Sequence, residues 1–263
     1  MKHKKKILLV GCGNMGNQLL EKWLGFYDIS VIESNVQKRK RLTKLKINLL
    51  DKEQINDTNY EFIVLCIKPN DFKSSVGDFL KHAQNNQKII SIMAGLNIHY
   101  IEAFLRPDFN IIRVMPNLYS GIGHGISGIF CNKKVKKKEI NSLIGILGDV
   151  LWLKKESELD FITAFFGGAP AYFFLFLSIL QQVLRKKNLD PSLEKALILK
   201  LLKGTNKYLK KNNASFDVLI SKVASKGGTT EEALNFLNKD NQFFNLFDSA
   251  INLATKKSKS LNV

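Results

Sequence analysis

The first half of the chain alternates short apolar runs with longer segments whose apolar positions recur at helical spacing. The apolar runs predict five strands, Lys6–Val10 and the stretches that end at Glu33, Pro69, Gly95 and Pro116. The segments between them predict helices over residues 14–25, 37–46, 70–82 and 97–105. Strands that alternate with helices of this length indicate a parallel, doubly wound α/β sheet. Ligands of such folds bind beyond the carboxyl ends of the strands, so the strand ends are expected to meet at one crevice.

The second half shows no strand pattern from about Leu159 onward. Asp190 and Pro191 resemble an N-cap and a first-turn proline that open a helix. Apolar side chains then recur at one-face spacing in two stripes, Leu193, Leu197 and Leu201, followed by Phe243, Phe247, Ile251 and Ala254. Such stripes are more typical of a core or a subunit interface than of a cofactor site. The pattern predicts an α/β domain over residues 1–155 and an all-α domain over residues 156–263, with dimerisation through the latter.

One long uncharged segment, residues 161–184, tests whether the chain enters a membrane. Its length would suffice for a spanning helix. Gly167, Gly168 and Pro170 interrupt it, however, and the apolar run that remains suits a buried core helix better. The chain is therefore expected not to span a membrane.

Composition and charge are those of an ordinary globular protein, with 45% hydrophobic and 24% charged residues. Lys and Arg outnumber Asp and Glu by 40 to 23, which gives a formal charge of +17. The basic clusters are short and carry no interleaved aromatic residues, so they indicate solvated faces, with a nucleic-acid surface as the lesser alternative. The distant cysteines Cys12, Cys66 and Cys131 form no disulfide framework and no metal quartet. A cytoplasmic protein without a signal peptide is expected.

A glycine-rich loop directly after the first strand carries the clearest chemical signal. Its Gly-x-Gly-x-x-Gly spacing follows a strand and opens a helix, as dinucleotide-binding loops do. The helix start offers free N–H groups and a positive dipole end to the pyrophosphate. The alternative is a purely structural turn. The loop predicts cofactor contacts at Gly11, Cys12, Gly13, Asn14, Met15 and Gly16.

The end of the second strand bears on the choice between NAD and NADP. Glu33 lies 20 residues beyond Gly13, where a carboxylate usually binds the ribose hydroxyls and disfavours a 2′-phosphate. Ser34 and Asn35, followed by Lys38 and Arg39, could instead hold that phosphate. Glu33, Ser34 and Asn35 are therefore predicted cofactor contacts, and NADPH and NADH both stay open.

A glycine-threonine turn in the second half is a candidate substrate site. Gly227 and Gly228 precede Thr229 and Thr230, which begin a predicted helix. Free N–H groups of Gly228, Thr229 and Thr230 could bind a carboxylate, and a threonine hydroxyl could bond a ring nitrogen. An ordinary capped helix is an equally good interpretation.

Seven ordered segments together resemble the pyrroline-5-carboxylate reductase family over nearly the whole chain. They are LLVGCGNMG from Leu8, VLCIKP from Val64, SIMAG from Ser91, RVMPN from Arg113, GDVLWL from Gly148, LDFITAFFGGAPAYFF from Leu159 and VASKGGTTEEAL from Val223. The resemblance implies a Rossmann domain followed by a helical dimerisation domain. It also implies hydride transfer from NADPH or NADH to a cyclic imino acid, reducing 1-pyrroline-5-carboxylate to L-proline, in a homo-oligomer that is a dimer at least and allows a ring of dimers.

The resemblance also assigns roles to single residues. Thr230 would be the catalytic hydrogen-bond partner of the imine nitrogen, and Ser225, Gly228 and Thr229 would help to bind the substrate. Asn117 would lie near the nicotinamide end of the cofactor. Further residues would border the cofactor, namely Cys66, Ile67, Lys68, Pro69, Met93 and Ala94. No metal is implied.

Departures from the family pattern keep other functions open. They cluster around the expected substrate crevice and helix interface, at Leu118, Tyr119, 166–172, Ser178, Gln182 and Lys226. A reductase of another cyclic imine and a catalytically silent nucleotide-binding homologue are the alternatives. A β-hydroxyacid dehydrogenase is disfavoured, because it needs an acid–base lysine on the interdomain helix and residues 161–184 contain none.

Overall fold

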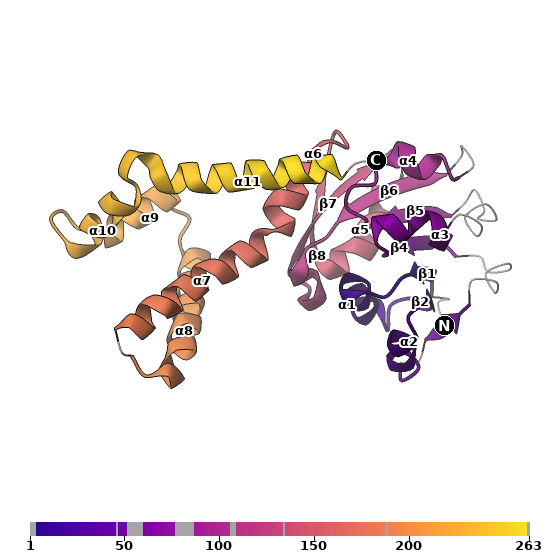
Figure 1. Ribbon diagram of the computed structural model, residues 1–263, viewed down its shortest axis with the longest axis horizontal. Helices are drawn as coiled ribbons and strands as arrows, with labels where there is room; N and C mark the ends of the chain where they lie inside the picture. The colour runs from indigo at the N-terminus through magenta and orange to yellow at the C-terminus, as the bar shows by residue number, and fades with distance from the viewer. Residues whose placement is uncertain are drawn as a thin grey trace. The chain divides into compact units, whose positions relative to one another are not determined.

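A computed structural model describes residues 4–45, 47–51, 60–76, 87–105, 109–133, 135–187 and 189–261. Its contacts divide the chain into two compact units, one made of residues 1–170 with 254–263 and the other of residues 171–253 (Figure 1). The first unit therefore contains both ends of the chain, and the second is inserted between them.

An eight-stranded sheet forms the centre of the first unit, in the order β3-β2-β1-β4-β5-β6-β7-β8. The strands are β1 Lys6–Val10, β2 Asp28–Ile32, β3 Asn48–Leu50, β4 Phe62–Leu65, β5 Lys88–Ser91, β6 Asn110–Met115, β7 Gly125–Cys131 and β8 Gly148–Trp152. Strands β1 to β6 pair in parallel, which confirms the doubly wound α/β class.

The five strands predicted from the sequence are β1, β2, β4, β5 and β6, and all of them pair in parallel. Strand β7, which was not predicted, runs antiparallel to β6. Only the short 3-10 helix Leu118–Ile122 connects these two strands. A parallel return needs a crossover of a dozen or more residues, so this connection turns the chain back on itself. Strand β8 then pairs in parallel with β7.

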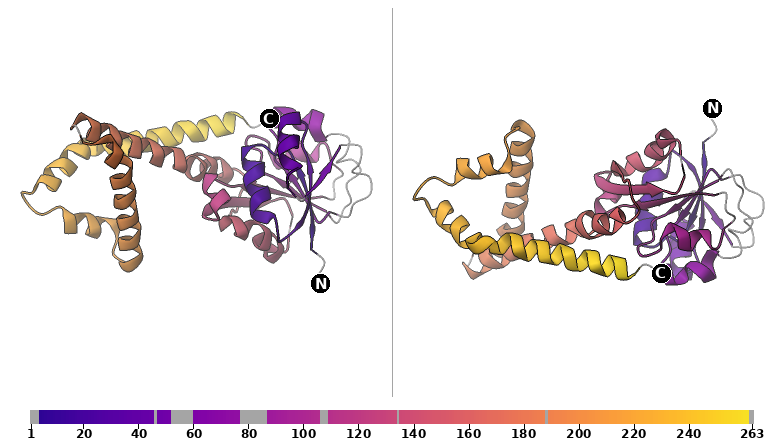
Figure 2. Two further views of the ribbon diagram at one scale, coloured as in Figure 1. Left: turned by 90° about the horizontal axis from the view of Figure 1, so that it is seen from below. Right: turned by 90° about the horizontal axis from the view of Figure 1, so that it is seen from above.

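Helices cover both faces of this sheet (Figure 2). Alternate residues of β1 point to opposite sides, so Ile7 and Leu9 join one apolar cluster while Leu8 and Val10 join the other. The covering helices are α1 Asn14–Trp23, α2 Val36–Leu42, α3 Phe72–Val76, α4 Ile98–Glu102 and α5 Lys137–Ile144. The helices predicted over 14–25, 37–46 and 97–105 exist but are shorter than expected, while residues 46 and 77–82 of the predicted helices lie outside the described residues.

The uncharged segment is one continuous helical stretch rather than an interrupted one. Helix α6, Glu158–Ile162, passes through a π-helical turn, Thr163–Gly167, into α7, Ala169–Lys186. The π turn includes Gly167, and Gly168 follows it in helical conformation. Pro170 lies in the first turn of α7, where a missing N–H is harmless. Glu158–Lys186 is thus long and apolar enough, by length and composition, to cross a membrane. The expected buried core helix is also wrong for the single chain, because only Pro170 of α7 is buried.

The described part of the second unit contains helices and no strand, as the sequence predicts from about Leu159 onward. They are the main part of α7, α8 Pro191–Lys211, α9 Phe216–Val223, α10 Thr229–Leu237 and most of α11 Gln242–Ser260. The N-cap of α8 is confirmed, because the Asp190 side chain accepts a hydrogen bond from the Ser192 N–H at 2.9 Å. Helices α7 and α8 are joined by the fully buried Glu194, whose carboxylate accepts hydrogen bonds from Gln181 and Arg185, each at 2.9 Å.

Most apolar side chains of the second unit are exposed in the single chain. The Leu193–Leu197–Leu201 stripe is 44–63% exposed, and within the described part of 171–253 only Ile198 and Ile251 are buried apolar residues. This pattern supports the interface interpretation of the stripe over the core one. The final residues of α11 belong to the first unit, so the contact units divide the chain differently from the predicted boundary after residue 155, which stays a prediction.

Candidate functional site

The glycine loop is shaped by three glycines with different constraints. Gly11 has φ +86°, and a Cβ on it would lie 2.6 Å from Ile67 Cγ2. A Cβ on Gly16 would lie 2.6 Å from the Gly11 carbonyl oxygen, which is how α1 packs closely against the end of β1. A Cβ on Gly13 would meet nothing closer than Lys38 Nζ at 4.0 Å. Gly13 is therefore not required by the protein's own packing, and its open side leaves room for a ligand against the backbone.

A cavity of 490 Å³ opens on this loop. It brings together three predicted groups of cofactor residues, Gly11–Gly13 after β1, Glu33–Asn35 after β2 and Cys66–Lys68 after β4. It is also lined by residues that the sequence analysis did not assign, Asp71, Ser74 and Ser75, which follow Pro69 at the start of α3. These three residues could have been predicted from Pro69, because a proline after a strand often opens a helix, and a helix that starts there places its first residues at the crevice. Glycine backbone, a carboxylate and helix-start hydroxyls fit the phosphates and ribose of a dinucleotide.

Glu33 links the two loops that border this cavity. Its carboxylate accepts hydrogen bonds from the backbone N–H of Cys12 at 2.8 Å and of Asn35 at 2.9 Å. The residue is buried, with 6% of its surface exposed. Because charge-assisted bonds hold both carboxylate oxygens, the glycine loop and the start of α2 are fixed relative to each other.

The two cations after β2 differ in where they are directed. Lys38 lines the cavity, and its Nζ lies 3.9 Å from Glu33 Oε2. Arg39 instead donates to the backbone carbonyls of Glu33 and Leu50 at 3.1 and 3.2 Å and pairs with Asp51 at 3.0 Å. The Arg39 guanidinium, which was a candidate for binding a 2′-phosphate, therefore already binds groups of the protein itself.

Cys12 and Cys66 border the cavity as neutral thiols at physiological pH. Burial, followed by the Glu33 carboxylate, raises the pKa of the Cys12 thiol to about 11. Burial also raises the pKa of Cys66 well above its ordinary value. Since the thiolate is the nucleophilic form, neither side chain is suited to covalent catalysis.

A second cavity, of 520 Å³, lies at the ends of β4 and β5. The predicted residues Lys68, Pro69 and Ala94 line it together with Leu261, near the end of the chain. Gly95 has φ +77°, and a Cβ on it would lie 2.5 Å from Leu261 Cβ. Leu261 was not predicted as a site residue, because nothing local connects a C-terminal residue with the end of β5.

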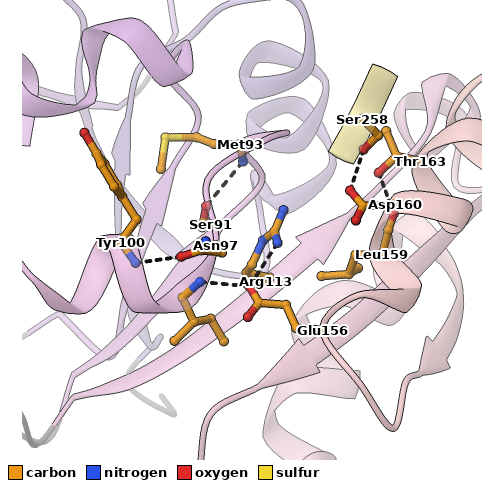
Figure 3. A network of polar contacts seen from close by, with 11 residues as sticks. Ser91, Met93, Asn97, Tyr100, Arg113, Glu156, Leu159, Asp160, Thr163 and Ser258 are labelled. Carbon is orange, nitrogen blue, oxygen red and sulfur yellow. Dashed lines mark hydrogen bonds and ion pairs between the residues drawn. The ribbon is translucent and has the colours of Figure 1, made fainter. Parts of the chain in front are cut away.

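A network of polar contacts holds the strand ends and the C-terminal helix in place (Figure 3). The Arg113 guanidinium pairs with Glu156 at 2.9 Å, and Glu156 also accepts the Ile98 N–H at 2.8 Å. The buried Ser258 donates to the buried Asp160 at 2.7 Å, which fixes the last turns of α11 to α6. The position of Leu261 thus depends on α6 and α11 as well as on the sheet.

The remaining predicted cofactor residues lie outside the lining of the first cavity. Asn14 and Met15 begin α1, Gly16 packs beneath the loop, and Met93 is buried beside Ser91. Asn117 is buried; its side chain donates to the Phe166 carbonyl at 3.2 Å and accepts the Ile126 N–H at 3.3 Å. Its amide connects the end of β6 to the π turn, and its expected place near the nicotinamide stays a prediction.

The turn before α10 has the predicted form with one correction. Gly227 has φ +72°, and α10 begins at Thr229 as expected. The N–H of Gly228 is not free, because it donates to the Ser225 carbonyl at 2.9 Å. In the described part of the chain no hydrogen bond reaches the N–H groups of Thr229 and Thr230, and they are the donors left for a ligand.

Comparison with known proteins gives matches to both halves of the chain. Residues 6–95 match a family model described as NADP oxidoreductase coenzyme F420-dependent, and residues 156–261 match one described as pyrroline-5-carboxylate reductase dimerisation. The pyrroline-5-carboxylate reductase of Pasteurella multocida is 30% identical over 98% of each chain.

Solved structures with the same fold carry the same family name. A pyrroline-5-carboxylate reductase from Coxiella burnetii is 26% identical, with a TM-score of 0.85 over 99% of this chain and 100% of that one. A pyrroline carboxylate reductase from Plasmodium falciparum with NADP bound is 28% identical, with a TM-score of 0.83 over 98% and 100% of the chains. The dinucleotide cavity, the helical second half and these full-length matches establish that this chain belongs to the pyrroline-5-carboxylate reductase family.

Proposed function

We propose that this protein reduces 1-pyrroline-5-carboxylate to L-proline with NADPH or NADH. Family membership makes it an oxidoreductase that acts on a C=N bond. The observation that carries the proposal is the cavity beside Gly13. The protein's own packing leaves room for a side chain at this position, yet a glycine stands there and leaves its backbone open to the cavity. Such an open backbone is what close approach of a pyrophosphate needs.

The first unit would hold the cofactor along the strand ends. The pyrophosphate would lie on Gly11–Gly16 and the start of α1, with the adenosine ribose beside Glu33–Asn35. Lys68, Pro69 and Ala94 border the second cavity, toward which the other half of the cofactor would extend. When bound, the dihydronicotinamide supplies the hydride.

The turn before α10 would hold the substrate. The free N–H groups of Thr229 and Thr230 are suited to the carboxylate of the imino acid, with Ser225 and Gly228 fixing the turn. The Thr230 hydroxyl would bond the ring nitrogen, which carries the proton while the ring carbon accepts the hydride. An iminium carbon is electrophilic enough that orientation accounts for much of the rate, and no strong base is needed.

A homodimer is the assembly that fits the exposed helices, and the relatives named above suggest a cytoplasmic protein. The residues matched to the dimerisation family include α7 to α11, whose side chains Phe173, Leu175 and Leu201 are each more than half exposed in the single chain. A second copy would cover these faces, and the apolar α7 would then be buried in protein rather than in a membrane. Larger rings of dimers would be built from this unit. No nucleic acid is part of the proposal.

The domain boundary proposed from the sequence follows the family division. The dimerisation match begins at residue 156, one residue after the end of the proposed domain 1–155. The family match therefore supports a domain boundary just before α6, with residues 156–263 as the dimerisation domain.

Turnover with pyrroline-5-carboxylate tests the reaction directly. Oxidation of NADPH or NADH that depends on this imino acid and produces proline is the expected result. Binding of cofactor without oxidation, across several cyclic imines, would instead identify a silent nucleotide-binding homologue. Oxidation with another imine only would identify a different reductase.

A threonine pair tests the assigned catalytic group. Thr230→Ala is expected to lower kcat/KM by roughly 10- to 100-fold, because one hydrogen bond to a charged ring nitrogen is lost. Thr230→Ser keeps the hydroxyl and is expected to retain most of the activity. Full kcat/KM in Thr230→Ala would remove Thr230 from this role.

A further inference from the structure

The adenosine end of the cofactor cavity carries a charge pattern that bears on which cofactor it accepts. NADH and NADPH differ only in the 2′-phosphate on the adenosine ribose. The groups at the end of β2 that line the cavity are Glu33, Ser34, Asn35 and Lys38. Which of these faces the 2′ position decides the preference.

Glu33 is held at the cavity wall as a fixed carboxylate. The Cys12 and Asn35 N–H groups bind its two oxygens at 2.8 and 2.9 Å, and its side chain is only 7% exposed. A buried carboxylate with both oxygens anchored cannot turn away from an incoming dianion. Its repulsion of a 2′-phosphate is screened less than that of a surface charge. A 2′-hydroxyl, by contrast, can donate to it.

Lys38 is directed toward the glycine loop. Its Nζ lies 4.0 Å from the position of a Cβ on Gly13 and 3.9 Å from Glu33 Oε2. The ammonium therefore lies over the loop that receives the pyrophosphate, a group that both cofactors share. Its side chain is 50% exposed, so its attraction for a more distant phosphate is screened by water.

Of the described residues between β2 and β3 that line the cavity, only Lys38 carries a positive charge. Arg39 donates to two backbone carbonyls and pairs with Asp51. The Asn35 side-chain oxygen caps α2 by accepting the Lys38 N–H at 3.1 Å. Ser34 offers a hydroxyl that serves a ribose and a phosphate equally well.

We infer that Glu33 makes this protein selective for NADH over NADPH, and that Lys38 binds the pyrophosphate common to both. The inference rests on the proposed function for the location of the cofactor and goes beyond it in naming the preferred one.

Binding measurements test the inference without relying on turnover. The dissociation constants of NADH and NADPH, and of adenosine 5′-monophosphate and adenosine 2′,5′-bisphosphate, are measured by calorimetry on the full-length protein. Each pair differs only by the 2′-phosphate. The member without this phosphate is expected to bind at least 10-fold more tightly in both pairs. Tighter NADPH binding overturns the inference and leaves the proposed function intact, whereas binding of neither dinucleotide overturns the proposed function and this inference with it.

Two variants assign the effect to the named residues. Glu33→Gln removes the charge with little change in size, and it is expected to tighten NADPH binding relative to NADH by at least 5-fold. Lys38→Met is expected to weaken both dinucleotides by a similar factor and to leave their ratio within 2-fold. A Lys38→Met variant that loses NADPH selectively would place this ammonium at the 2′-phosphate and overturn the assignment. If a folded Glu33→Gln variant keeps the wild-type ratio of the NADH and NADPH dissociation constants, the role assigned to Glu33 is overturned.

Discussion

The two contact units differ in whether they cover their own apolar surface. The sheet unit has two buried clusters, one on each face, built from strand residues and from α1, α3, α4 and α5. The helical unit buries only Ile198 and Ile251 among the apolar residues of its described part. The first unit thus covers its two main apolar clusters within one chain, whereas the second leaves most of its apolar side chains exposed, which is what the proposed dimer would cover.

The largest expected effect comes from placing charge on the exposed face of α7. Leu175 and Ile179 lie one helical turn apart and are 62% and 48% exposed. In Leu175→Asp/Ile179→Asp the dimer is expected to weaken by at least ~3 kcal/mol, roughly 100-fold in dissociation constant, because each interface loses these apolar contacts in both copies. Sedimentation velocity over a concentration series measures this.

A matched control and a second readout sharpen this test. Lys207→Asp on α8 changes the charge by the same amount at an exposed polar position, and the dimer is expected to survive. If the sheet unit is complete within one chain, the double variant should still bind dinucleotide with an affinity near that of the wild type. Loss of cofactor binding together with the dimer would contradict the comparison.

Inside the sheet unit, two glycines of one loop separate packing from ligand binding. Gly16→Ala is expected to lower the free energy of unfolding by about 1–3 kcal/mol, because its Cβ would meet the Gly11 carbonyl at 2.6 Å. Gly13→Ala has no such contact and is expected to leave the melting temperature within ~1 °C while weakening cofactor binding by at least 10-fold. Thermal unfolding without ligand and dinucleotide titration measure the two effects. Equal loss of stability in both variants would contradict the view that Gly13 is kept for a ligand.

The features predicted correctly from the sequence are those specified by nearby residues. The glycine spacing after β1 fixed the loop, its following helix and the cavity, because each of these depends on residues within one βαβ unit. The turn at Gly227 and the start of α10 were likewise predictable from a local glycine-threonine pattern.

The features that were missed depend on contacts between distant parts of the chain. The antiparallel β7 follows from the short connection at Leu118–Ile122, which does not show on its own where the next strand pairs. The π turn in the uncharged segment carries the chain through Gly167 into the helical Gly168, although two adjacent glycines ordinarily indicate a helix break. Leu261 reaches Gly95 only because α11 returns to the sheet unit, and no local pattern carries that information.

The return of α11 to the sheet unit can be tested through one buried hydrogen bond. Ser258→Ala removes the donor to Asp160 and is expected to destabilise the last turns of α11 by about 1–2 kcal/mol. Hydrogen exchange should show protection in these turns reduced by roughly 5- to 30-fold, with the strands of the sheet unchanged. Ser260→Ala, whose exposed hydroxyl bonds only the Lys257 carbonyl of its own helix, is the control. Equal effects of both variants would mean that the Asp160 contact does not hold the chain end.

The smallest expected effect concerns the pH dependence of the completed sheet unit, through Cys12. Burial raises the pKa of this thiol to about 11, from an ordinary value of 9.0, so the folded protein keeps a proton that the unfolded chain releases. Stability from this group is therefore fully present below about pH 9 and is lost as the pH rises toward 11. In Cys12→Ala the decline in the free energy of unfolding between these pH values should be smaller by on the order of 1 kcal/mol, allowing for partial solvent screening. Urea unfolding of both proteins at about pH 7.5, 9 and 10.5, which cover most of the titration, measures the difference. An identical pH profile in both proteins would show that the loop end of the sheet unit is open to water, and that this region is less complete within one chain than its packing indicates.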